Sequence, residues 1–471
     1  MPLISEYIDP QWAKFWKTKQ KYAHDAVGVL NEGLQKGGGP FQVITPLGPK
    51  IILPNKYADE VRSNPHLSFA RQISKEFLSH LSGYESFHTL FGSVLVETIK
   101  SKLTQSLNYI IGDLSDETAA ALQERLGESQ EWRTINVSKE SLELVARLST
   151  LVFIGPELSR NREWLDIVGS YSINVMIAVH KLRLFPAFLR RIANIFLPEG
   201  QACRKAIRDA RRLINPVVAK RREERRSQSK DGKLPKSTDT IGWMDDVAKG
   251  KPYDFPLHQL FLSGAAIHTT SNFLGNAILD ICSYPEYVEP LRAEIRVAIR
   301  ENGWTKAALQ KLKLMDSFLK ESQRLSPASI VSITRNSDAK LELSDGTILP
   351  KGAPISVATD RMRDPMVYAD PQKFDGNRFF KKRQIPGQEN NWQLVTVTAD
   401  HLGFGLGTHS CPGRFFAANE AKVAFSYLLI HYDFRFLSGQ SRPERLVHSE
   451  STGVNPLAQI ECRRTGEILS E

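Results

Sequence analysis

Apolar and polar positions along this chain follow mostly the period of an α-helix. From about residue 68 to 300 the pattern is helical and is broken by glycine and proline. Residues 257–283 are mostly small and apolar, which predicts one long buried helix. Residues 305–325 predict another helix that ends before Pro327. A last helix is expected over residues 414–431.

Two parts of the chain carry the signals of β-structure instead. Residues 41–54 contain two β-rich runs on either side of a Pro-Leu-Gly turn, which predicts a hairpin. Short strands are expected between residues 339 and 360, around the turns at 344–346 and 350–352. The chain is therefore predicted to be mainly α-helical with a smaller β portion.

Composition adds limits on the class of protein. The 471 residues are 41% hydrophobic and 24% charged, which is ordinary for a globular protein and excludes a disordered chain. The four cysteines are scattered and form no C-x-x-C pair, which argues against a zinc ribbon, a redox dithiol and a disulfide framework. A reducing compartment is the simplest interpretation. The cysteines are Cys203, Cys282, Cys411 and Cys462.

The positive charge is concentrated in one segment. Lysine and arginine outnumber the acidic residues by 62 to 52, and residues 204–236 alone contribute +9 of the net charge of +10. This segment predicts a solvated helix and loop, with attraction to an anionic membrane face as the alternative. No aromatic side chains alternate with the basic ones, so nucleic acid is not an expected partner.

Residues 180–198 combine bulky apolar side chains with arginines, and Leu184, Phe188 and Ile192 recur at helical spacing. Two interpretations stay open: a helix that lies on a membrane surface, or an amphipathic helix packed on the core. No apolar run approaches the roughly 20 residues that a transmembrane helix needs. Residues 1–12 are too polar for a signal peptide, so the chain as written is expected to be soluble or peripheral.

The most specific chemical signal is F-G-L-G-T-H-S-C-P-G-R at residues 404–414. A thiolate ligand to haem iron requires one cysteine, a loop whose N–H groups approach the sulfur, and a helix start that favours the anion. Cys411 supplies the sulfur, and Gly407 and Gly413 allow a tight loop. Pro412 suits the first turn of the helix that follows.

Two further side chains of this segment have candidate roles. Phe404 would shield the sulfur, and His409 would reach a haem propionate. The G-x-G-x-G run does not have the spacing of a dinucleotide-binding loop. His409 and Cys411 lack the second ligand pair of a zinc site. The segment therefore predicts a haem–thiolate centre with Cys411 as the iron ligand.

The same segment resembles the haem-binding loop of the cytochrome P-450 family, F-x-x-G-x-(H/R)-x-C-x-G, and further motifs follow the family's order. Glu321 and Arg324 match its E-x-x-R, and Arg378 lies in F-D-G-N-R-F, 33 residues before the cysteine. Because Glu321 and Arg324 are three residues apart, they share a helix face and can pair. The resemblance implies that all three form a buried, structural ion-pair network.

The long predicted helix is similar to the family's distal helix. Its A-A-I-H-T-T at residues 265–270 matches A-G-x-(D/E)-T-(T/S), which implies that Thr269 hydrogen-bonds dioxygen or water and helps to deliver protons. The alternative for such a threonine is a hydrogen bond to its own i−4 carbonyl. His268 stands where an acid is usual, and both a proton relay and simple packing stay open for its imidazole.

The propionate contacts are less regular. The family's W-x-x-x-R pair is absent from residues 95–125, where Lys102 or Gln105 is the candidate substitute. Arg335 follows a short β-like run and is the candidate contact for the other propionate.

The resemblance implies a cytochrome P-450 fold over residues 1–471 as a single domain, with haem b between the long distal helix and the proximal Cys loop. It implies a monooxygenase of the fungal secondary-metabolism branch that hydroxylates or oxidises C–H bonds of a bulky apolar metabolite, such as a terpenoid, an indole alkaloid or a polyketide. Dioxygen is the expected co-substrate. Electrons are expected from NADPH through a separate flavoprotein reductase, with basic residues near the Cys loop as its docking face.

The location follows from the same resemblance. The N-terminal anchor helix typical of eukaryotic members is expected to be absent or trimmed. If it was trimmed, the enzyme belongs at the cytosolic face of the endoplasmic reticulum; otherwise it is cytosolic or peripheral to a membrane.

Two rival functions stay open. The first is an isomerase, dehydratase or ring-forming oxidase on the same fold without net oxygen insertion, which His268 in place of the acid allows. The second is a non-catalytic protein bound at a membrane surface, suggested by residues 180–230.

Overall fold

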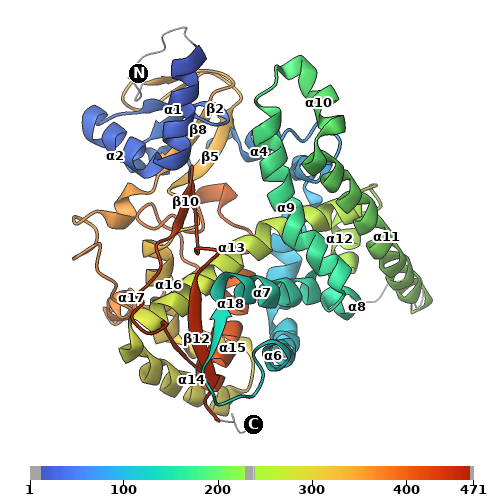
Figure 1. The fold of residues 1–471 in the computed structure, drawn as a ribbon, viewed down its shortest axis with the longest axis vertical. Coiled ribbons are helices and arrows are strands. Elements are labelled where there is room, and N and C mark those ends of the chain that lie inside the picture. Colours follow the sequence, from blue (N-terminus) through green and yellow to red (C-terminus); the bar gives the residue numbers. More distant parts are fainter. Residues whose placement is uncertain (1–11, 229–236, 238, 467–471) are drawn as a thin grey trace. The chain divides into compact units, whose positions relative to one another are not determined.

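The computed structural model describes residues 12–228, 237 and 239–466, and most of them are helical (Figure 1). The chain forms two compact units, each built from distant segments of the sequence. The first comprises Met1–Glu76, Ser317–Cys411 and Glu444–Asn455, and the second comprises Phe77–Asp316, Pro412–Pro443 and Pro456–Glu471. The predicted mainly α-helical fold with a smaller β portion is confirmed. The single haem-centred domain over residues 1–471 stays a prediction.

A five-stranded sheet with the strand order β1-β2-β8-β5-β3 forms the core of the first unit. β1 and β2 are the predicted hairpin, in which Phe41 pairs with Ile52. Leu53 on β2 and Val357 on β8 are completely buried in the apolar core on this sheet. The elements of this unit are α1 (Trp12–His24), α2 (Ala26–Gly37), β1 (Phe41–Thr45), β2 (Gly48–Leu53), α3 (Ala58–Val61), β3 (Leu67–Ser68), α4 (Phe69–Glu76), β5 (Val331–Ser337), β6 (Leu341–Glu342), β7 (Ile348–Leu349), β8 (Pro354–Ala358), α17 (Arg378–Lys382), β10 (Leu446–His448) and β11 (Ser451–Gly453).

A buried lysine joins distant segments of this first unit. The Lys50 ammonium on β2 donates to Glu450 Oε2 at 2.9 Å and to Glu76 Oε1 at 3.3 Å. The Tyr22 hydroxyl of α1 donates to the other oxygen of Glu450 at 2.9 Å. Because these groups are removed from water, each ion pair depends on the presence of all its members.

The second unit is a bundle around α13 (Phe255–Ser283), the predicted long helix. The Asp254 side chain caps its N-terminus by accepting from Leu257 N–H, and the helix ends before Pro285. α13 packs most extensively against α7 and also contacts α9, α11 and α18. The elements of this unit are α5 (Val94–Glu97), α6 (Thr104–Leu126), β4 (Arg133–Asn136), α7 (Val137–Phe153), α8 (Pro156–Ser159), α9 (Arg162–Leu182), α10 (Arg190–Phe196), α11 (Pro198–Ser227), α12 (Thr240–Ala248), α13, α14 (Val288–Asn302), α15 (Lys306–Lys311), α18 (Arg414–His431), β9 (Tyr432–Arg435) and β12 (Gln459–Arg464).

The prediction of one helix over residues 305–325 is wrong, because the chain breaks at Leu312 into α15 and α16 (Lys313–Leu325). Leu312 is completely buried and has a non-helical ψ of 69°. The Glu294 carboxylate accepts the backbone N–H of Leu314 at 2.7 Å and that of the next residue at 2.9 Å. This carboxylate caps the start of α16. The buried Leu312 side chain and this cap together explain why the chain forms two helices instead of one.

Residues 180–198 do not form one helix. α9 ends at Leu182, and α10 follows after a 3₁₀ turn at Ala187–Leu189. Phe188 is 79% and Phe196 73% exposed, and Asn194 is the only buried residue of α10. The interpretation of a helix packed on the core is therefore wrong for this segment.

The basic segment over residues 204–236 is partly described. It lies on α11 up to Ser227, whereas residues 229–236 are outside the described residues, as is the polar N-terminus over residues 1–11. Within the described ranges, no helix combines the length and the apolar character that crossing a bilayer requires.

A neutral carboxyl group lies inside the second unit. Glu420 on α18 is completely buried, and its Oε1 accepts the Ser149 hydroxyl of α7 at 2.7 Å. Its Oε2 has no hydrogen-bond partner among the described residues. Burial raises the pKa of this carboxyl to about 8, so it holds its proton at neutral pH.

Glu420→Gln is expected to stabilise the protein increasingly as pH rises. The folded pKa lies above that of an unfolded glutamate, so the favourable contribution of the wild-type carboxyl is complete at low pH and is lost as pH rises towards 8. The difference in unfolding free energy should grow by about 1.4 kcal/mol per pH unit between about pH 5 and pH 8. Urea unfolding across this range measures it. Glu223→Gln, at an exposed position, is the control, and equal pH slopes for both variants would refute the assignment.

Candidate functional site

The Cys loop closes on itself within the first unit. The backbone N–H of Cys411 donates to the Phe404 carbonyl at 2.8 Å, and Ser410 N–H donates to the Gly407 carbonyl at 3.0 Å. Gly405 and Gly407 turn the chain with φ angles of 71° and 74°, which side chains other than glycine rarely adopt. A thiol-bearing residue thus ends a tight, hydrogen-bonded loop.

The other predicted members of the loop occupy defined positions. A Cβ on Gly407 would lie 2.4 Å from the Arg62 carbonyl oxygen, so this glycine is required by space as well as by its φ angle. Phe404 is half-buried, and His409 is exposed at the end of the 3₁₀ turn Gly407–His409. Gly413 belongs to the second unit, where it is the N-cap residue of α18.

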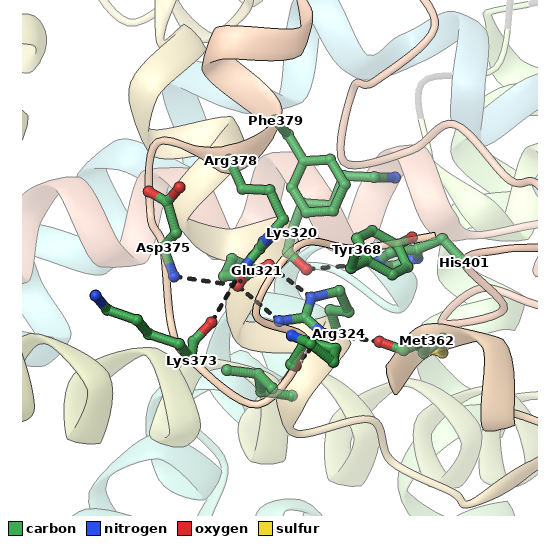
Figure 2. Close-up of polar contacts among 12 residues, drawn as sticks. Lys320, Glu321, Arg324, Met362, Tyr368, Lys373, Asp375, Arg378, Phe379 and His401 are labelled. Atoms are coloured by element: carbon green, nitrogen blue, oxygen red, sulfur yellow. Dashed lines mark hydrogen bonds and ion pairs between the residues drawn. The ribbon is translucent and has the colours of Figure 1, made fainter. Parts of the chain in front are cut away.

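Glu321, Arg324 and Arg378 are brought together in the first unit (Figure 2). Arg324 donates to both oxygens of Glu321, at 2.7 and 2.8 Å, and Arg378 Nε donates to Oε1 at 3.0 Å. Glu321 and Arg324 are completely buried and Arg378 is 9% exposed. A buried carboxylate with a bidentate arginine has the geometry in which charge-assisted hydrogen bonds are strongest.

The cluster holds two guanidinium groups and one carboxylate, so one positive charge is left over. Backbone carbonyls stabilise it. Arg324 Nη1 donates to the carbonyl of Met362 at 2.7 Å, and Arg378 donates to those of Ala369 at 2.6 Å and Lys373 at 3.0 Å. Both guanidinium groups also lie over the Tyr368 ring, at 4.9 and 6.0 Å from its centroid. The cluster therefore ties α16 to the loop that leads to α17, which is a structural role.

Arg335 is a buried guanidinium on β5, and it forms no ion pair with a carboxylate among the described residues. It is 3% exposed, donates to its neighbour's carbonyl, Thr334 O, at 2.7 Å, and lies over the Phe69 ring. Burial lowers the pKa of this arginine to about 10. An uncompensated buried cation is costly, so the site fits an anionic group such as a propionate.

Thr269 and His268 lie on α13 in the second unit. The Thr269 hydroxyl donates to the Ala265 carbonyl at 2.9 Å, which is the i−4 hydrogen bond that the sequence left as the alternative. Its side chain is exposed on a helix that is otherwise largely buried. The His268 ring is hydrogen-bonded to the Val168 backbone of α9, and its Nε2 has no partner among the described residues. Burial lowers the pKa of His268, so its imidazole is neutral at pH 7.

The candidate substitutes for the missing W-x-x-x-R pair occupy the region before and within α6. The Lys102 ammonium lies in a π-helical turn, 3.9 Å from the Asp246 carboxylate of α12. Gln105 is exposed near the start of α6.

The three remaining cysteines are in environments that keep them protonated. Burial raises the pKa of Cys203 and of Cys282 to about 12, and it also raises the pKa of Cys462. Cys462 lies in β12, paired with Arg133 of β4 on one side and with Phe434 of β9 on the other. An iron ligand must be a thiolate, so these sites do not favour ligation.

Two buried polar neighbours of the Glu321 cluster are not predicted from the sequence. The Lys320 ammonium is buried and donates to the carbonyls of Gln393 and Thr396 at 2.9 and 3.0 Å. His401 is 2% exposed, with Nε2 3.3 Å from the Lys320 carbonyl (Figure 2). The one available signal is that Lys320 adjoins Glu321, but a lysine in a polar helix normally lies at the surface.

The fold and these motifs correspond to a family model, that of cytochrome P-450, which matches residues 88–460. The chain therefore belongs to the cytochrome P-450 family. Its relatives include the fungal cytochrome P-450 monooxygenases pyr3 of Aspergillus fumigatus, hepE of Aspergillus oryzae and ptmU of Penicillium ochrochloron. They are 40%, 43% and 37% identical to this chain, over 99%, 96% and 97% of it and over 92%, 84% and 90% of the relatives respectively.

These similarities confirm several predictions. The chain is a cytochrome P-450 monooxygenase of the fungal secondary-metabolism branch, and its cofactor is haem with a cysteine thiolate as axial ligand. As a member of this family it uses dioxygen, an electron-supplying redox partner and an apolar substrate. The residue that supplies the thiolate and the substrate class belong to the proposal below.

Glu321→Gln is expected to destabilise the first unit by about 3–5 kcal/mol, because it leaves Arg324 and Arg378 buried without their anion. Chemical unfolding of the variant and the wild type measures the difference. The control is Asp375→Asn, which leaves the backbone N–H that Asp375 donates to Glu321 in place. If both variants unfold at the same denaturant concentration as the wild type, the cluster does not stabilise the fold.

Proposed function

We propose that this enzyme hydroxylates or oxidises C–H bonds of a bulky apolar metabolite, such as a terpenoid, an indole alkaloid or a polyketide, in secondary-metabolite biosynthesis. The observation that carries the proposal is the closed loop at residues 404–411, where the one half-exposed cysteine outside regular structure hydrogen-bonds back to Phe404. Ala265 and Ala266 on α13 support an apolar substrate, since small side chains leave room beside Thr269.

We assign Cys411 as the axial ligand and place the haem contacts on the residues predicted from the sequence. Phe404 shields the sulfur, Gly407 and Gly413 permit the loop, and His409 contacts a propionate. Arg335 fits the other propionate, because its buried guanidinium pairs with no carboxylate in the part of the chain that the structure describes. When bound, the haem supplies activation of dioxygen, and the thiolate donates electron density that favours O–O cleavage.

The proton-delivering group on α13 is proposed to be the Thr269 hydroxyl. It is a hydrogen-bond donor held at Ala265 O, and rotation of its χ1 would turn it towards a ligand. His268 is proposed to relay protons as a neutral imidazole, through its Nε2, which has no hydrogen-bond partner among the described residues. Packing against α9 is the alternative role, which the hydrogen bond to Val168 supports.

Cys411→Ser is expected to abolish the red-shifted carbon-monoxide band that a thiolate-ligated haem shows. Cys462→Ser and Cys203→Ser are the matched controls and should retain the band, because both thiols are buried in packed elements. Difference spectroscopy of the reduced proteins measures it. If the band survives Cys411→Ser and disappears in one of the controls, the cysteine replaced in that control is the iron ligand.

The alternative reaction class is an isomerisation, dehydration or ring formation without net oxygen insertion, and His268 in place of the usual acid is the feature that favours it. Turnover under isotopically labelled dioxygen separates the two classes. Monooxygenation places one labelled oxygen atom in the product, with its partner leaving as water. An unlabelled, rearranged product would exclude monooxygenation for that substrate.

The electron donor is proposed to be an NADPH-dependent flavoprotein reductase that docks on basic residues outside the Cys loop. The proposed location is the cytosolic face of the endoplasmic reticulum, or the cytosol with a peripheral membrane contact; the contact is proposed over residues 181–196. There, Leu184, Ile192 and Ile195 are each 56% exposed, and Lys181 and Arg191 are exposed beside them. Apolar side chains flanked by basic ones suit the interface of an anionic bilayer.

Phe188→Glu combined with Phe196→Glu is expected to reduce binding of this chain to vesicles that contain phosphatidylserine, because both side chains are largely exposed. Cosedimentation measures the bound fraction. Met366→Glu, at an apolar position 91% exposed in the first unit, is the control and should bind like the wild type. Equal binding of all three proteins would place the membrane contact elsewhere.

A further inference from the structure

The residue before the Cys loop makes an unusually close contact with α16. A Cβ built on Gly403 would lie 2.2 Å from Gln323 Oε1, 2.4 Å from its Cδ and 2.9 Å from its Cγ. The side-chain amide of Gln323 therefore lies directly against the backbone that leads into Phe404. Both residues, the loop and Cys411 belong to the first unit.

The glycine at 403 is explained by this contact and not by backbone conformation. Gly405 and Gly407 have positive φ angles, whereas Gly403 is not among the positive-φ glycines. An alanine could adopt the conformation of residue 403, but its methyl group would overlap three atoms of Gln323. Close approach of the two segments is therefore what requires a glycine.

The side-chain oxygen of Gln323 is buried and lacks a conventional partner in the described part of the chain. Gln323 is 7% exposed, and its Oε1 has no hydrogen-bond partner among the described residues. The Cα–H bond of Gly403 that a Cβ would replace points at this oxygen, which is the geometry of a weak Cα–H···O contact. A buried amide oxygen without a conventional partner is costly, so its position needs an explanation.

Buried contacts hold α16 beside this glycine. Gln323 lies between Glu321 and Arg324, which are completely buried and bound to each other. Lys320, which shares a helix face with Gln323, donates to the carbonyls of Gln393 and Thr396. The part of α16 that carries Gln323 is therefore held by the buried contacts of its neighbours.

We propose that Gln323 is a positioning residue for the Cys loop: its buried amide is the surface against which Gly403 packs, and this contact sets where Phe404 and Cys411 lie. The inference rests on the proposed role of Cys411 as the iron ligand. Phe404 follows Gly403 directly, and its carbonyl accepts the Cys411 N–H. A displacement of Gly403 would therefore also shift Cys411, through the hydrogen bond between Cys411 N–H and the Phe404 carbonyl.

The test is a double-mutant cycle on the haem-loaded enzyme. Gly403→Ala should convert much of the red-shifted carbon-monoxide band into the band of a protein that has lost thiolate ligation. Gln323→Ala removes the three atoms that the new methyl group would overlap, so the double variant should recover the red-shifted band. Gln323→Ala alone should keep the band but lose it faster on warming. Ser322→Ala is the control: its buried hydroxyl has no partner among the described residues, and the band should be unchanged.

Two outcomes would overturn the inference. One is a Gly403→Ala enzyme with a wild-type spectrum. The other is loss of the band, or failure to bind haem, that Gln323→Ala does not relieve. If the wild type itself lacks the red-shifted band, or keeps it in Cys411→Ser, the assignment of the ligand fails instead, so the two failures are distinguishable.

Discussion

The first unit depends on the burial of a single carboxylate. Glu321 is removed from water, where an isolated anion would be prohibitively costly, and two guanidinium groups and a backbone N–H compensate it. The arginines carry more charge than one carboxylate neutralises, and the surplus is met by main-chain carbonyls between residues 362 and 373. An irregular loop thereby acquires a fixed shape without regular secondary structure. That loop lies in the same unit as the Cys loop. The ion pairs of Glu321 therefore help to fix the shape of the unit that carries the Cys loop.

The sequence predicts the secondary structure well where local patterns decide it. The hairpin over residues 41–54, the long α13 and the last helix from Arg414 to His431 all occur as predicted, because turn residues, caps and apolar periodicity act over a few neighbours. The single helix over residues 305–325 fails because its break is imposed from outside, by the distant carboxylate of Glu294. Similarly, apolar residues around Phe188 recur at helical spacing in the sequence. In the structure these side chains are exposed, and the backbone there forms a 3₁₀ turn instead of one continuous helix.

In the candidate site, too, local spacing predicts some contacts, whereas others depend on packing between distant segments. Spacing brings Glu321 and Arg324 onto one helix face, and the family resemblance adds Arg378, which donates to Glu321 from 57 residues away. The contribution of Lys320 and Gln323 cannot be predicted from spacing, because α16 has the polar composition of a surface helix and is buried. Only the carbonyls and aromatic rings that surround it make that burial possible. The uncompensated Arg335 is likewise visible only when its surroundings are known.

The pairing of Lys50 with Glu450 has a consequence for how the protein is made. Four hundred residues separate the two partners, and the intervening chain includes most of the second unit. During synthesis the N-terminal hairpin leaves the ribosome long before Glu450 exists, so until then Lys50 has only Glu76 of its two carboxylate partners. Contacts of such high sequence separation slow folding, since the closure of a long loop precedes any gain from the contact. The N-terminal sheet should therefore be among the last regions to become resistant to proteases in a nascent chain.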